Sequence, residues 1–114
     1  MHKFALIFCL TSGIASTAVA EGDYENGKKL VKSWDCIACH GLTGNERRPE
    51  EPGVKSSPML AGQPASYLIR TLKEFKTRAR IDDHESSNMS ARAQALSNKE
   101  IENIAVYFAA QKRY

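Results

Sequence analysis

The stretch Cys36-Ile37-Ala38-Cys39-His40 decides both the fold and the chemistry of this chain. On one helical turn, positions i, i+3 and i+4 share a face, so Cys36, Cys39 and His40 can point toward one flat ligand. The C-x-x-C-H spacing is the signature for covalent attachment of a c-type haem. We therefore predict that both thiols form thioethers with the haem vinyl groups and that His40 binds the iron.

The first twenty residues have the features of an export signal, because Lys3 precedes the apolar run Phe4–Leu10. Small residues follow this run and fit cleavage after Ala20. The segment is too short and too rich in Ser, Thr and Gly to span a bilayer, which needs about 20 mainly apolar residues. We expect residues 1–20 to be removed and residues 21–114 to form one domain, soluble in the periplasm.

Net charge and cysteine content narrow the possible functions. Removing Lys3 with the signal lowers the formal net charge from +3 to +2, which is too mild to argue for nucleic-acid binding. Cys9 also leaves with the signal, so Cys36 and Cys39 are the two cysteines of the mature chain. The sequence shows no Ser/His/Asp, paired-carboxylate or phosphate-cradling arrangement, so we expect no enzymatic activity.

Three other roles are chemically open to the two cysteines. A disulfide between Cys36 and Cys39 would close a very short loop and restrain the unfolded chain little. A thioredoxin-like site needs its C-x-x-C beside a βαβ pattern, which this sequence lacks. A zinc site with His40 and His84 would not have the usual paired spacing of structural zinc ligands. The motif, the export signal and the helical pattern together favour haem.

Three segments carry the signals of amphipathic helices and none alternates like a β-strand, which predicts an all-α fold. The first begins with Asp23 as its N-cap and has Gly27 on its apolar face. The second covers residues 64–78, with Pro64 in its first turn and a basic face opposite the apolar one. The third opens with the capping box of Ser97 and Glu100. Its apolar stripe consists of Ile101, Ile104, Ala105, Tyr107 and Phe108.

Nearly the whole mature sequence resembles the class I cytochromes c. It is similar to a periplasmic bacterial branch with a P-x-L-A-G-Q segment, here Pro58-Met59-Leu60-Ala61-Gly62-Gln63. The resemblance implies three main helices around one haem, with the first and last helices crossing where Gly27 meets Tyr107. It also implies that the Pro58 carbonyl accepts a hydrogen bond from His40 Nδ1, leaving Nε2 for iron. That branch includes two-haem proteins, and the one C-x-x-C-H motif here implies a single unit.

The resemblance also suggests the sixth iron ligand. Met89 lies in the polar stretch 82–90, between the second and third helices, where the family has its axial methionine. An exposed loop is an unusual place for a large apolar side chain, so a ligand role explains Met89 better than core packing does. Met59 follows Pro58 and is expected on the proximal side of the haem, in the core. His84 is an alternative ligand, and its imidazole would lower the reduction potential.

With His40 and Met89 both bound, the iron of haem c has no open coordination site, and the thioether raises its potential. We therefore expect a monomeric periplasmic electron-transfer protein that passes single electrons between redox protein partners through small docking faces. Two alternatives stay open. One is a haem subunit permanently bound to a catalytic oxidoreductase, and the other is a ligand-binding sensor haem in which Met89 leaves the iron.

Overall fold

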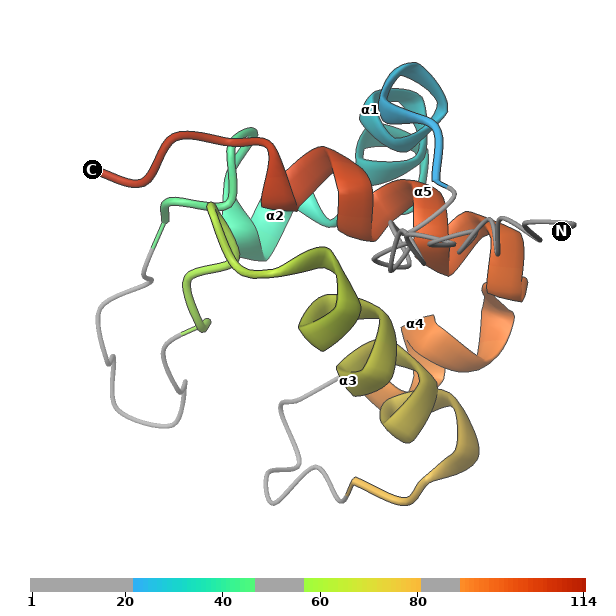
Figure 1. The fold of residues 1–114 in the computed structure, drawn as a ribbon. Helices are drawn as coiled ribbons and strands as arrows, with labels where there is room; N and C mark the ends of the chain where they lie inside the picture. The colour runs from blue at the N-terminus through green and yellow to red at the C-terminus, as the bar shows by residue number, and fades with distance from the viewer. Residues whose placement is uncertain (1–21, 47–56, 81–88) are drawn as a thin grey trace, which may run out of the picture.

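The computed structural model describes residues 22–46, 57–80 and 89–114, and these ranges contain helices and connecting segments without strands (Figure 1). The all-α prediction is confirmed. None of the helices in these ranges is long and apolar enough to cross a membrane. The elements in chain order are α1 Tyr24–Ser33, α2 Ile37–His40, α3 Ala65–Thr77, α4 Met89–Ala95 and α5 Asn98–Ala109.

Helices α1 and α5 cross in close contact, although they lie at opposite ends of the chain (Figure 1). At the crossing, an added Cβ on Gly27 would lie 2.0 Å from the carbonyl oxygen of Asn103 and 2.9 Å from Tyr107 Cβ. Only glycine permits this approach. The Asn103 side chain also fixes the start of α1, because Asn103 Oδ1 accepts a hydrogen bond of 2.8 Å from the backbone N–H of Asp23. The predicted crossing at Gly27 is confirmed.

Helix α5 forms the centre of the core. The largest fully buried side chains of the core, among the described residues, are Phe108, Ile101 and Val31. Tyr107 is buried too, and its ring lies 5.3 Å from the rings of both Tyr24 and Phe108. The five apolar positions predicted for the last helix are therefore all buried, as expected.

The capping box at the start of α5 is confirmed and extends to a third residue. Ser97 Oγ accepts from Glu100 N at 3.1 Å, and Glu100 Oε1 accepts from Ser97 N at 2.9 Å. Glu100 Oε2 accepts from Trp34 Nε1 at 3.1 Å, which ties the end of α1 to the start of α5. The Ser97 N–H and then the Trp34 N–H stabilise the carboxylate, so the pKa of Glu100 is lowered.

Replacing Glu100 with glutamine should reduce the loss of stability in acid. A lowered folded-state pKa gives stability that is present above the unfolded value of about 4.3 and is lost as pH falls through the folded value. At pH 7 we expect Glu100→Gln to cost no more than about 1 kcal/mol, because the side chain is partly exposed. Urea unfolding at pH 7 and in acid measures the free energy of unfolding of the parent and of Glu100→Gln, with Glu102→Gln as the control. If the parent and Glu100→Gln lose the same stability between pH 7 and acid, the prediction is contradicted.

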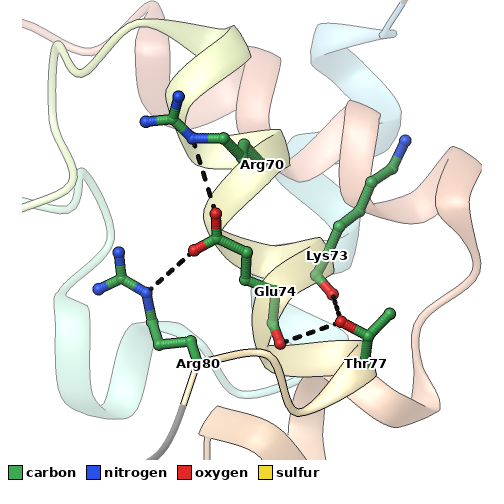
Figure 2. A network of polar contacts seen from close by, with 5 residues as sticks. All are labelled: Arg70, Lys73, Glu74, Thr77 and Arg80. Carbon is green, nitrogen blue, oxygen red and sulfur yellow. Dashed lines mark hydrogen bonds and ion pairs between the residues drawn. The ribbon is translucent and has the colours of Figure 1, made fainter.

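Helix α3 differs slightly from the prediction at its start. Pro64 is the N-cap residue rather than part of the first turn, because its ψ of 133° is extended. The helix ends at Thr77, and its C-cap residue Arg78 has a left-handed φ of 60°. On the polar face, Figure 2 shows Glu74 between two arginines, with Nε–O distances of 3.8 Å to Arg70 and 3.3 Å to Arg80. Glu74 thus offsets part of the basic face, although such exposed pairs add little stability.

The prediction that Met89 lies in a loop is wrong, because Met89 is the first residue of α4. The residues that follow it include three alanines, which favour a helix. Ala93 of this helix and Leu96 just after it are buried, which fixes α4 beside α3. With only seven residues, α4 is too short for a clear helical pattern in the sequence. Ser90 also belongs to α4, and residues 82–88 of the predicted loop, with His84, lie outside the described residues.

Candidate haem-binding site

The chain turns sharply between α1 and the C-x-x-C-H motif. Asp35 has a left-handed φ of 57°, which ends α1 and lets a new helical turn begin at once. The amide of Cys36 still bonds to Val31 O at 3.0 Å. The amide of His40 bonds to Cys36 O at 3.0 Å, so the cysteines and the histidine share one helical turn, as predicted. Both cysteines are free and half-buried.

The His40 side chain is held as a neutral imidazole, which is the form that binds a metal. Its side chain is 5% exposed, and its Nδ1 lies 3.0 Å from Pro58 O. A carbonyl oxygen only accepts, so Nδ1 carries the proton and Nε2 keeps its lone pair. Burial lowers the pKa of His40, against the opposing effect of the Pro58 carbonyl. The predicted contact between Pro58 and His40 is therefore present.

The segment that carries Pro58 is fixed by the turn after His40. The amides of Leu60 and Ala61 both bond to Gly44 O, at 2.8 and 3.1 Å. Gly44 itself has a φ of +74°, and an added Cβ there would lie 2.7 Å from Phe108 Cδ1. These backbone contacts connect the P-x-L segment to the core, and they position the carbonyl that orients the histidine.

Arg92 of α4 is a part of the site that the sequence did not reveal. Its Nη1 donates a hydrogen bond of 2.7 Å to the backbone carbonyl of Trp34, two residues before Cys36. Burial raises the pKa of the Cys36 thiol, and the charge of Arg92 opposes this shift. The same charge helps to lower the pKa of His40. A contact across 58 residues leaves no local sequence signal, so the sequence did not predict it.

The donor groups present fit a covalently attached haem. Two free thiols and a neutral imidazole on one turn supply what thioether attachment and proximal ligation require. Thr71 Oγ1 on α3 is buried and has no hydrogen-bond partner within the described part of the chain. Within those same ranges, no three His, Cys, Asp or Glu side chains gather as a metal ion would require, and His84 of the zinc alternative lies outside them. Met89 is half-buried at the start of α4.

An all-helical domain with free C-x-x-C thiols and an oriented, buried histidine belongs to the class of small haem-binding proteins. The comparisons specify the family, because the family model described as "Cytochrome c" matches residues 24–112. The chain therefore belongs to the cytochrome c family. Its fold is that of the class I members, and its cofactor is covalently attached haem c.

Individual relatives agree with this result. The chain is 35% identical over 117 residues to cytochrome c4 of Stutzerimonas stutzeri, across 98% of this chain and 52% of that protein. It is 34% identical to cytochrome c-554(548) of Halomonas halodenitrificans over 91 residues, which are 80% of this chain and 99% of the relative. The crystal structure of reduced cytochrome c4 from Pseudomonas stutzeri matches with a TM-score of 0.60 and 34% identity, over 82% of this chain and 47% of that one. The chain thus spans about half the length of the cytochromes c4 and nearly all of the shorter relative.

Proposed function

We propose that this chain is a periplasmic carrier of single electrons, with one haem c attached through Cys36 and Cys39 and with His40 and Met89 as the axial ligands. The hydrogen bond from His40 Nδ1 to Pro58 O carries the proposal, because it prepares the other ring nitrogen for iron before any haem is bound. When bound, the haem supplies the Fe(II)/Fe(III) couple.

Each residue has a distinct task in this scheme. Cys36 and Cys39 each form one thioether, so the cofactor cannot dissociate outside the cytoplasm. Pro58 holds the ring of His40 in one tautomer and one orientation. Met89 would supply the second protein ligand of the iron, which would exclude water and small ligands and favour the reduced iron. A protein built in this way exchanges electrons and has no open site for substrate chemistry.

We further propose that residues 1–20 are an export signal, cleaved after Ala20, and that residues 21–114 act as one monomeric haem domain. The match to nearly the full length of the halomonad cytochrome c-554(548) supports a single unit. Partners would be redox proteins that dock briefly through small interfaces. A carrier of this kind migrates as a monomer on a sizing column, whereas a permanent subunit co-purifies with its catalytic partner in a fixed ratio.

The attachment chemistry is tested by replacing the cysteines. We expect the parent, exported together with a haem-attachment system, to show a c-type absorption spectrum and to keep its haem during extraction with acidified organic solvent. The double variant Cys36→Ala/Cys39→Ala should lose all covalent haem, because no thioether can form. Cys9→Ala is the matched control, since it removes the third cysteine of the sequence and should leave the haem unchanged. Covalent haem in the double variant, or none in the parent, would disprove the assignment.

A further inference from the structure

We propose that Arg92 raises the reduction potential of the haem by holding a fixed positive charge beside the attachment turn. This inference rests on the haem site proposed above. It goes further by giving a role to a residue that neither binds the iron nor bonds to the haem. A nearby cation destabilises Fe(III) more than Fe(II), because the oxidised centre carries one more positive charge.

The position of the charge is fixed by a hydrogen bond. Arg92 Nη1 lies 2.7 Å from Trp34 O, which is a short bond from a charged donor. Trp34 follows the last residue of α1, where free carbonyls and the helix dipole favour a cation. The side chain of Arg92 is half-buried, so solvent screens its charge less than it screens the charges on the surface.

The charges around Arg92 determine how much of its positive charge is compensated. Within residues 22–46, 57–80 and 89–114, no carboxylate lies within ion-pair distance of Arg92. Glu100 binds the indole N–H of Trp34, and Asp35 is exposed beside Cys36, so two negative charges partly offset the field. Lys76 is a second cation beside the end of α4, since its Nζ donates to the carbonyl of Leu96 just after that helix.

Arg92 also lies one helical turn after Met89, the proposed distal ligand, while its guanidinium reaches the carbonyl of Trp34, two residues before Cys36. A purely structural role remains the competing explanation, because the same hydrogen bond ties α4 to the end of α1. The reduction potential separates the two explanations, since a structural link does not require a charge.

The test compares three substitutions by potentiometric titration of the haem-loaded protein. Arg92→Gln removes the charge, Arg92→Lys keeps it, and Lys29→Gln removes an exposed charge of α1 as the matched control. A unit charge at roughly 10 Å, with an effective dielectric constant of about 20 to 40, changes a one-electron equilibrium about 4-fold to 15-fold. We expect Arg92→Gln to lower the ratio of reduced to oxidised protein by this factor, where tenfold corresponds to about 59 mV. Arg92→Lys and Lys29→Gln should each change it less than about twofold.

Two results would overturn the proposal. One is a ratio of reduced to oxidised protein in Arg92→Gln that equals the ratio in Lys29→Gln. The other is an equal fall in the ratio of reduced to oxidised protein in Arg92→Lys and Arg92→Gln, together with loss of the near-infrared sulfur-to-iron band. That result would make Arg92 a structural support for α4. If Arg92→Gln does not accumulate, Arg92→Met keeps the packing of the aliphatic stem and takes its place in the comparison. Absence of covalent haem from the parent would instead refute the haem site itself, so the two failures are distinguishable.

Discussion

Gly27→Ala should destabilise the haem-loaded protein by at least about 3 kcal/mol, the upper part of the range for overpacking in a core. The added methyl carbon would lie 2.0 Å from the backbone oxygen of Asn103, which no side-chain rotation can relieve. Helices α1 and α5 must then move apart. Their separation would disturb the hydrogen bond from Asp23 N to Asn103 and the contact of the Tyr24 ring with Tyr107.

Thermal unfolding followed by far-ultraviolet circular dichroism measures the effect. For a domain of this size, about 3 kcal/mol corresponds to a fall in Tm of roughly 12 to 24 °C. Lys29→Ala is the control, because Lys29 is exposed on the same helix and alanine favours a helix. Without the crowding, Gly27→Ala would gain up to about 1 kcal/mol from helix propensity alone. A Tm equal to that of Lys29→Ala would therefore mean that the helices do not cross as closely as described.

The sequence predicted the parts of the fold that local chemistry determines. Asp23 as an N-cap and the Ser97/Glu100 capping box are short-range hydrogen-bond patterns, so the helix starts could be placed within a residue. The role of Gly27 was less accessible, because a glycine in a helix has no local justification. Its reason is a close approach to Asn103 and Tyr107; the resemblance to a known family indicated the crossing with Tyr107, whereas Asn103 was not predicted.

The candidate site likewise has parts that the sequence predicted and parts that it did not. Cys36, Cys39 and His40 are close in sequence, so their shared helical turn follows from helical spacing alone. Helix α4 and the bond from Arg92 to Trp34 were not predicted, since a seven-residue helix has little periodicity and the contact joins residues far apart. The missed features therefore depend on how helices pack, which one sequence without its fold does not specify.

Met89→Ala should open the distal side of the iron while leaving the haem attached. Loss of the thioether should lower the reduction potential, on the order of 0.1 V, because sulfur ligation favours Fe(II) and axial ligands control potentials over about 0.8 V. The near-infrared sulfur-to-iron band should vanish, and the reduced protein should then bind carbon monoxide at neutral pH. The parent should not bind it, since both axial positions are filled.

Met59→Ala is the matched control for this experiment. Met59 is also half-buried, but it follows Pro58, whose carbonyl is bonded to the proximal histidine. We therefore expect Met59 to lie away from the distal side, so its removal should preserve the near-infrared band and exclude carbon monoxide. A band that survives in Met89→Ala would contradict the ligand assignment. If the parent itself lacks the band and binds carbon monoxide, the iron has an open position, and the sensor alternative would replace electron transfer as the function that this site supports.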